Sequence, residues 1–389
     1  MFLVSGLKKV AINSLDKITQ KISKKNEIKK FKDPKRVEIF ETVQLSKEQM
    51  QQIDDFYLTN YGKKIPYTWH RHFTAFTGNF DVKYIPELLF IPEFERYMNV
   101  NREYTKTFED KSVLPLIAQS VGVKVPKSYI SVCEGAYRDS NFRVITKEAA
   151  IKILCDLGEC FAKPTVETGS GVGCKVLNLQ NGVDIVSHTP LSDVLDSFGS
   201  NFIIQERLHC HKSISDIYSG SVNTFRIITY RWKDQFYTMP IIMRIGSGGH
   251  YLDNAHAGGM FIAVSEDGKL HRTAFTEFKK EFEKHPDTGL VFDGYQIECF
   301  DDVVKAALKM HEAIPQVGVI NWDFTIDSNG EPILIEANMN GGSIWLMEMA
   351  HGCGVFGDLA EEVLQWLRFV NTLPMTERKK YSFGKMENC

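Results

Sequence analysis

The sequence lacks the features that mark secreted, membrane-spanning and nucleic-acid-binding proteins. Its formal net charge is −3 over 389 residues, so no overall positive charge attracts nucleic acid and we expect no such partner. The eight cysteines form no C-x-x-C pair and no zinc-like spacing, which favours reduced thiols and a cytoplasmic location. No run of about 18 apolar residues spans a bilayer. Residues 1–10 lack the apolar segment of a secretory signal, so export by that route is not expected.

Three familiar catalytic patterns are also missing. No G-K-[ST] follows the glycine-rich stretch at residues 168–173, so this stretch is not a Walker loop, and it is not a dinucleotide fingerprint. No Ser-His-Asp or Cys-His set is evident. The sequence therefore offers no side-chain nucleophile.

The most informative stretch is residues 318–342, GVINWDFTIDSNGEPILIEANMNGG. Alternating apolar and polar residues, turn residues and a second apolar run predict two antiparallel strands joined by a tight turn. Opposite residues of such strands lie about 5 Å apart, so Asp323 is expected near Glu336 and Asn338. These oxygen donors suit Mg2+. The alternative is an exposed hairpin with ordinary acids.

A second candidate is a glycine-rich turn that follows a strand ending at Lys163. Residues 168–173, TGSGVG, precede another strand, and glycines let backbone N–H groups close over phosphate oxygens. Lys163 adds a positive charge there. Lys111 is expected near the first turn of a helix, where an ammonium group can stand beside a bound anion. The alternatives are a plain turn and a surface lysine.

Three further segments carry polar residues on predicted strands or loops. Residues 201–208, NFIIQERL, read either as a hinge that presents backbone groups to an adenine edge or as a plain core strand. Strands at residues 221–232 and 237–245 carry Arg226 and Arg244, which either stabilise charge during transfer or pair with surface acids. The glycine-rich residues 246–259 are too long for a simple turn and read either as a mobile loop or as a substrate-contacting loop.

The amino-terminal residues 1–36 combine a positive charge bias with apolar residues at helical spacing. Such a basic amphipathic helix either lies on an anionic membrane surface or packs on its own protein with a solvated lysine face. Further on, Ser46 and Gln49 fit a capping box for a helix at residues 46–58. His70 and His72 are read as substrate or metal contacts or, alternatively, as core residues.

The order of these features resembles the ATP-grasp superfamily, and SVNTFRI, DNAHAGG, INWDFTI and IEANMNGG resemble its sugar-transfer-associated family. The resemblance covers roughly residues 104–368. It departs from the D-alanine:D-alanine ligases at Asn321, where an arginine is expected, so either Arg226 or Arg244 would supply that charge. The resemblance implies catalytic roles for Arg226, Arg244 and Lys163; ATP contacts at Lys111, Lys163, Gly169, Ser170, Gly171, Gly173, Gln205, Glu206, Leu208 and either His209 or His211; Mg2+ ligands at Asp323, Glu336 and Asn338; and substrate contacts at Asn223, Asp253, Asn254, Gly258, Gly259 and Asn340.

The resemblance also implies a fold and a domain arrangement. The class is α+β, with two α+β subdomains that grip ATP between antiparallel sheets, preceded by a mostly helical amino-terminal region. We expect a basic helix at residues 1–36, a helical region at 37–103, the ATP-grasp domain at 104–370 with a hinge near 201–210, and a tail at 371–389.

The implied function is an ATP- and Mg2+-dependent carboxylate–amine ligase that forms an amide through an acylphosphate. The expected partners are a small-molecule or saccharide carboxylate and an amine such as an amino acid, in the biosynthesis of a sugar or polysaccharide precursor. A kinase on the same fold and a nucleotide-binding module without turnover remain alternatives. The expected location is cytoplasmic, with residues 1–36 as a candidate contact to the inner membrane surface.

Overall fold

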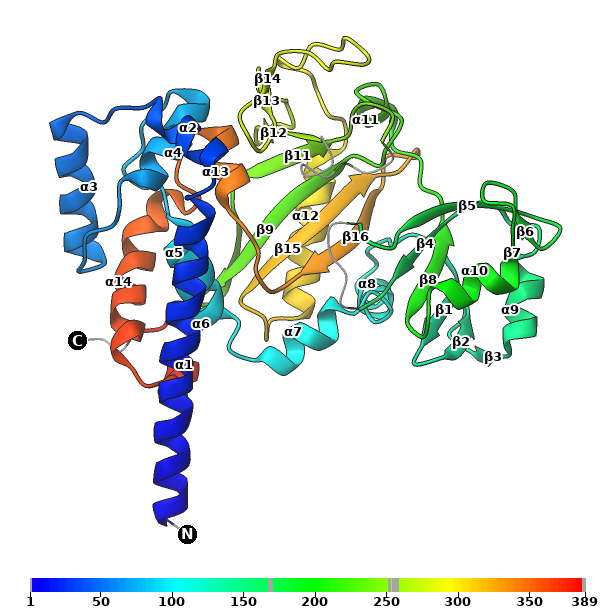
Figure 1. Ribbon diagram of the computed structural model, residues 1–389, viewed down its shortest axis with the longest axis horizontal. Coiled ribbons are helices and arrows are strands. Elements are labelled where there is room, and N and C mark those ends of the chain that lie inside the picture. The colour runs from blue at the N-terminus through cyan, green and yellow to red at the C-terminus, as the bar shows by residue number, and fades with distance from the viewer. Residues whose placement is uncertain (1, 167–170, 251–252, 254–258, 387–389) are drawn as a thin grey trace.

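Two antiparallel sheets and a layer of helices make up the protein, as the computed structural model shows for residues 2–166, 171–250, 253 and 259–386, with side chains from residue 11 onward (Figure 1). Each sheet has eight described strands. In Figure 1 the first sheet lies at the right, the second in the centre, and helices from both ends of the chain at the left. The α+β class predicted from the sequence is confirmed.

The first sheet has the strand order β3-β2-β1-β8-β4-β5-β6-β7. Its central strand β8 lies between β1 and β4, and Phe202, Ile203 and Ile204 are all buried, so both faces of the sheet are covered at this strand. Phe202 and Ile204 belong to a buried apolar cluster that also contains side chains of the helices α9 and α10. The bounds are β1 Ser128–Cys133, β2 Ala136–Asp139, β3 Val144–Ile145, α9 Lys147–Leu154, β4 Gly158–Pro164, β5 Lys175–Gln180, β6 Val183–Asp184, β7 Thr189–Pro190, α10 Leu191–Ser197 and β8 Phe202–Glu206.

The second sheet has the order β14-β13-β12-β11-β9-β15-β16, and β10 pairs with β9. Strand β15 shows the predicted alternation: Ile320, Trp322 and Phe324 belong to an apolar cluster with helix α12. Its polar residues are buried too, because the opposite face of the sheet is also covered. The bounds are α11 Lys212–Ser215, β9 Thr224–Trp232, β10 Gln235–Thr238, β11 Ile241–Ile245, β12 Met260–Val264, β13 Ala274–Phe275, β14 Glu281–Phe282, α12 Phe300–Ala313, β15 Val319–Ile326 and β16 Pro332–Asn338.

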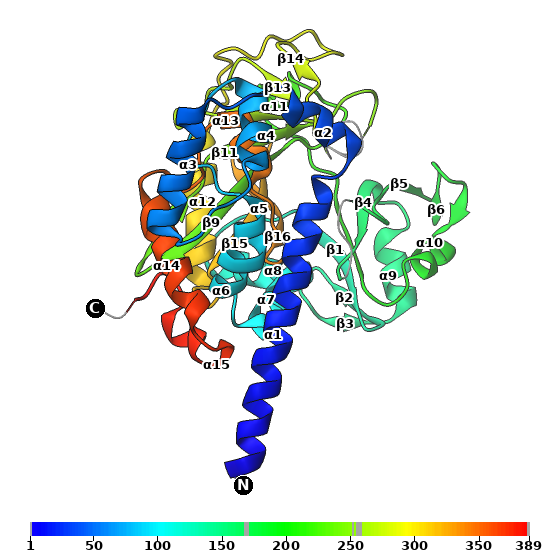
Figure 2. The same ribbon diagram turned by 60° about the vertical axis from the view of Figure 1, so that its left-hand side comes forward.

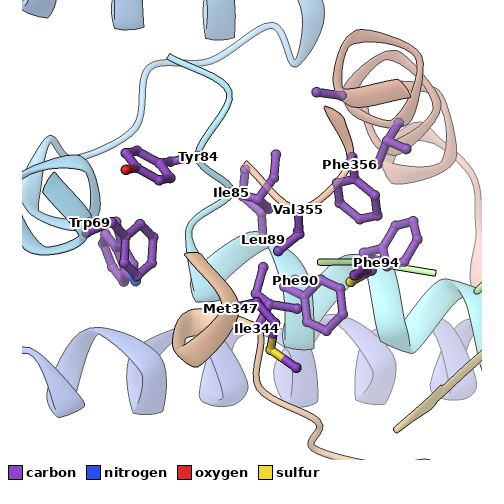
Figure 3. Packing of buried hydrophobic residues seen from close by; sticks show 14 of the residues in the cluster. Trp69, Tyr84, Ile85, Leu89, Phe90, Phe94, Ile344, Met347, Val355 and Phe356 are labelled. Atoms are coloured by element: carbon purple, nitrogen blue, oxygen red, sulfur yellow. The ribbon is translucent and has the colours of Figure 1, made fainter. Parts of the chain in front are cut away.

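Helices from the two ends of the chain form a common layer on the second sheet. Figure 3 shows the amino-terminal side chains Trp69, Leu89 and Phe90 near Ile344 and Met347, which follow β16. The bounds are α1 Phe2–Lys30, α2 Pro34–Glu41, α3 Lys47–Asn60, α4 Thr68–Thr77, α5 Glu87–Leu89, the π-helix Phe90–Glu95, α6 Arg96–Met98, α7 Arg102–Glu109, α8 Leu114–Ser120, α13 Trp345–His351, the 3-10 helix Gly357–Leu359, α14 Ala360–Thr372, α15 Met375–Arg378 and the 3-10 helix Lys379–Tyr381.

Two predictions from the sequence, a capping box and the role of two histidines, concern the amino-terminal helices α3 and α4. Both hydrogen bonds of the capping box between Ser46 and Gln49 are present at the start of α3. His70 and His72 lie in the core on α4, where burial lowers the pKa of His70 to about 4 and that of His72 to about 3. The core interpretation of the two histidines is therefore the one that the structure supports.

Candidate active site

A cleft of about 760 Å³ is lined by strands of both sheets. One wall comes from β4, β5 and the end of β8, and the other from β9, β11, β15 and β16. Thirteen of the candidate residues predicted from the sequence line this cleft: Lys163, Gly171, Gln205, Glu206, Leu208, His209, Arg226, Arg244, Asp253, Asp323, Glu336, Asn338 and Asn340.

The candidate metal ligands lie on the β15–β16 hairpin. Asp323 stands directly opposite Glu336 in the antiparallel register, and Asn338 stands opposite Asn321. Two carboxylates and one amide therefore approach the cleft from adjacent strands, which is the donor set that Mg2+ accepts when substrate phosphates and waters complete its shell. Within the part of the chain that the structure describes, no group of three or more His, Cys, Asp or Glu side chains is assembled for a metal. A metal held here would rely on this mixed set.

Both candidate arginines contact Asp323. Arg226, opposite Asp323 on β9, binds its two oxygens at 2.5 and 3.1 Å, and Arg244 on β11 lies 3.0 Å from Oδ2. Burial alone would raise the pKa of Asp323, but the two guanidinium charges outweigh it and hold the pKa below its usual range. Asp253 is 3.5 Å from Arg244, and burial raises its pKa.

Two lysines reach β16, Lys163 from the facing wall of the cleft and Lys111 from the segment between α7 and α8. Lys163, at the end of β4, is buried and donates to the Ile335 carbonyl at 3.2 Å. Lys111 Nζ lies 3.4 Å from Glu336 Oε1. Burial lowers the pKa of Lys163, and the nearby charge of Glu336 opposes that effect. Two guanidinium groups at Asp323, the Lys111 ammonium group at Glu336 and the Lys163 ammonium group at the adjacent Ile335 carbonyl are thus gathered together, an arrangement suited to polyphosphate.

The end of β8 holds the candidate adenine contacts. The Gln205 side chain donates to the Pro126 carbonyl at 3.4 Å, and Glu206 accepts the Lys127 N–H at 2.7 Å. These side chains fasten the end of the strand to the segment before β1. Leu208 follows on the cleft wall.

Sequence reasoning missed the apolar lining beside this end. Phe161 on β4 and Val176 on β5 line the cleft, as does Ile335 on the facing strand. Phe161 stands two residues before Lys163, so both side chains lie on the same face of β4. This two-residue spacing from Lys163 was the sequence signal that could have identified Phe161 as a lining residue.

Several candidates lie off the cleft wall. Gly173 has φ +78°, and a Cβ there would approach Pro164 Cγ to 2.9 Å, so the position requires glycine. His211 caps α11 through Ser213, whereas His209 lines the cleft. Asn223 is buried and accepts the Gly246 N–H at 3.1 Å. Gly259 precedes β12 and, like Lys111, is not part of the lining. Gly169, Ser170, Asn254 and Gly258 lie outside the described residues.

Three glutamates that the sequence analysis did not single out hold the loop after Asn338. Glu109 accepts the Met339 N–H at 2.7 Å, and Glu95 accepts the N–H groups of Gly341 and Gly342, each at 2.7 Å. Glu87 accepts those of Ile344 and Trp345 at 2.8 and 3.0 Å. We call these three side chains the glutamate bracket. Burial raises the pKa of Glu95 to about 8 and that of Glu87 to about 7. The bracket fixes a loop whose residues 340–343 line the cleft.

A family model described as sugar-transfer associated ATP-grasp matches residues 90–363. The chain therefore belongs to the sugar-transfer associated ATP-grasp family, and the family and fold predicted from the sequence are confirmed. The match begins at residue 90, in the π-helix, whereas the sequence resemblance was expected to begin near residue 104.

Comparison with solved structures gives distant similarity. An L-amino acid ligase from Bacillus licheniformis is 13% identical with a TM-score of 0.38, over 67% of this chain and 49% of its own. VanG D-Ala:D-Ser ligase from Enterococcus faecalis is 17% identical with a TM-score of 0.39, over 67% and 62%. D-alanine--D-alanine ligase from Bacillus anthracis is 13% identical with a TM-score of 0.38, over 71% and 70%. The chain spans about half the length of the first of these. Comparison with curated protein sequences gives no match.

Proposed function

We propose that the protein is an ATP- and Mg2+-dependent ligase that joins a carboxylate to an amine through an acylphosphate. The observation that carries this proposal is the gathering of four cationic side chains around β15 and β16. Lys111 pairs with Glu336, Arg226 and Arg244 pair with Asp323, and Lys163 donates to the Ile335 carbonyl next to Glu336. Cations placed on both walls of one cleft neutralise the charge of a triphosphate and of the phosphoryl group in transfer.

The reaction has two balanced steps. A substrate carboxylate oxygen attacks the γ-phosphorus, and the bond between that phosphorus and the departing ADP oxygen breaks. The amine nitrogen then attacks the acyl carbon, loses a proton, and displaces inorganic phosphate as the amide forms. Asp323, Glu336 and Asn338 would hold Mg2+, which supplies charge neutralisation at the phosphate oxygens.

The chain's own residues are assigned to positioning. Lys163 would bind the phosphates from the first-sheet side and Lys111 from beside Glu336, while Asp323 holds Arg226 and Arg244 in place. A bidentate contact fixes the Arg226 guanidinium plane, so its orientation is set before substrate arrives. No covalent adduct with a side chain is required.

The saccharide part of the proposal is supported by the family description and by the composition of one end of the cleft. Asn340, Ser343 and Trp345 line that end. Because Arg36 stacks on the Trp345 ring, with its guanidinium carbon 4.2 Å from the ring centroid, the polar side chains of Asn340 and Ser343 are the groups that would meet sugar hydroxyls. The proposed carboxylate substrate is therefore of the uronic acid or sugar acid type, with an amino acid or amino group as acceptor.

A screen of uronic acids and amino acids, alone and in pairs, tests the proposal through release of ADP and phosphate. We expect phosphate release only when a carboxylate and an amine are both present, with an amide in the product. Release of ADP without phosphate, with a phosphorylated hydroxyl in the product, would instead show a kinase. Nucleotide binding without turnover on any pair would support a binding module.

A further inference from the structure

Helix α1 packs on the rest of the protein through its polar face. Asp16 forms ion pairs with Arg96 and Arg378, the second at 2.6 Å. One turn later, the Gln20 amide donates to the Tyr97 hydroxyl at 2.5 Å. Lys24 then pairs with Glu93 of the π-helix. An amphipathic helix usually turns its apolar stripe to the body, so this docking is inverted.

The apolar residues of α1 face outward as a consequence. Leu15, Ile18 and Ile22 are 65%, 55% and 53% exposed. Their spacing of three and four residues places them on one side of the helix. We call these three residues the apolar stripe. Single exposed apolar residues are common, but three in register on one helix form a contact surface.

The charges on the same surface are all positive. The two acidic residues of α1, Asp16 and Glu27, are buried and paired, Glu27 with Lys30 at 2.7 Å. The exposed charged residues of α1 from residue 11 onward follow each other at steps of four: Lys17, Lys21, Lys25 and Lys29. We call these four residues the lysine row.

The amino-terminal end of α1 also projects from the protein. In both ribbon views the amino-terminal end of α1 extends beyond the rest of the molecule (Figures 1 and 2). None of the described helices is both long and apolar enough to cross a membrane. A helix with this composition lies in the plane of a bilayer rather than through it.

We propose that α1 binds the surface of an anionic lipid bilayer, with the apolar stripe in the boundary between headgroups and acyl chains and the lysine row against lipid phosphates. Charge complementarity selects this occupant, because the exposed charges of the helix are cationic and lipid headgroups supply the matching anions. A second copy of α1 would instead bring two lysine rows together.

Flotation of the full chain with phosphatidylcholine vesicles, with and without phosphatidylserine, tests the proposal. We expect binding only with phosphatidylserine, weakened by added salt. A triple variant that replaces the apolar stripe by serine (Leu15→Ser, Ile18→Ser and Ile22→Ser) should bind phosphatidylserine vesicles more than about tenfold more weakly. Replacing the lysine row by glutamine should do the same.

A matched control replaces four exposed lysines on other elements by glutamine, and it should leave binding unchanged; these are Lys63, Lys106, Lys152 and Lys284. All variants change exposed side chains, so their circular dichroism and nucleotide affinity should match the parent chain. Equal binding to both vesicle types, binding that survives loss of the stripe, or a dimer in light scattering that the stripe variant abolishes would each overturn the proposal.

Discussion

At the scale of single residues, Glu336 and Asp323 differ in what already surrounds them. The side chain of Asp323 is 7% exposed and bound by two arginines, whereas that of Glu336 is 25% exposed. An incoming cation therefore meets Glu336 as the more accessible carboxylate, while Asp323 keeps the arginines in position.

The first prediction concerns this carboxylate. Glu336→Gln keeps the shape of the side chain but removes the charge that a divalent cation requires, so Mg2+-dependent ATP turnover should fall by more than about a hundredfold, in the range seen when a key electrostatic group is lost. Thermal unfolding should change little. Glu331→Gln, at the tip of the same hairpin, is the control. Normal turnover by Glu336→Gln would remove this residue from the metal site.

His72 gives a pH prediction. Burial and the charge of Arg36 lower its pKa to about 3, and neither ring nitrogen has a hydrogen-bond partner among the described residues. The unfolded chain takes up this proton near pH 6.5, so the contribution of His72 to stability is present above that pH and is lost as the pH falls toward 3. His72→Phe should reduce the loss by up to about 1.4 kcal/mol per pH unit in urea unfolding. The exposed His250→Phe should leave the slope unchanged.

At the scale of elements, strand β4 brings Lys163 to the cleft directly before the glycine-rich turn. Gly171 and Gly173 both have positive φ, at +73° and +78°. We propose that residues 169–173, of which 169 and 170 lie outside the described residues, close over the phosphates together with Lys163. A non-hydrolysable MgATP analogue should then protect the chain from proteolysis between Val166 and Lys175. An identical cleavage rate with and without the analogue would contradict the proposed closure of this loop over the phosphates.

The lysine itself can be tested separately. Lys163→Ala should weaken nucleotide binding and slow ATP turnover together, because the ammonium group would interact with phosphates in both the ground state and the transition state. The control is Lys175→Ala on the next strand, where the ammonium group donates to Ser197 on α10 at 3.2 Å. Equal losses in the two variants would assign the effect to folding rather than to the phosphate contact.

The glutamate bracket connects two elements that are far apart in the sequence, the helices near residue 90 and the loop near residue 340. Glutamine in place of Glu95 has one carbonyl oxygen for two N–H donors, so one donor loses its partner. We expect a cost of about 1–3 kcal/mol in unfolding free energy. The KM of the carboxylate or amine substrate should also rise, with MgATP affinity retained. Glu103→Gln on exposed α7 should change neither quantity.

At the scale of the whole molecule, the features that depend on local sequence patterns and on the order of motifs could be predicted. The features that depend on long-range contacts could not. The hairpin at residues 318–342 was predictable because strand alternation and turn residues are local, and the order of motifs led to the family. The glutamate bracket was not, because Glu95 and Gly341 are joined only by folding. The inverted docking of α1 was hidden for the same reason: its partners Glu93, Arg96 and Arg378 are far along the sequence.

The π-helix has one further consequence, because it carries both Glu93 and Glu95. Glu93 binds Lys24 of α1, and Glu95 binds the loop at the cleft. The π-helix thus joins the proposed lipid contact to the proposed substrate contact. If the two contacts are energetically linked, equilibrium thermodynamics makes the linkage reciprocal: the factor by which anionic vesicles change ligand affinity must equal the factor by which the ligand changes vesicle affinity. Measuring both affinities with one ligand would show whether the membrane acts as an effector of this protein.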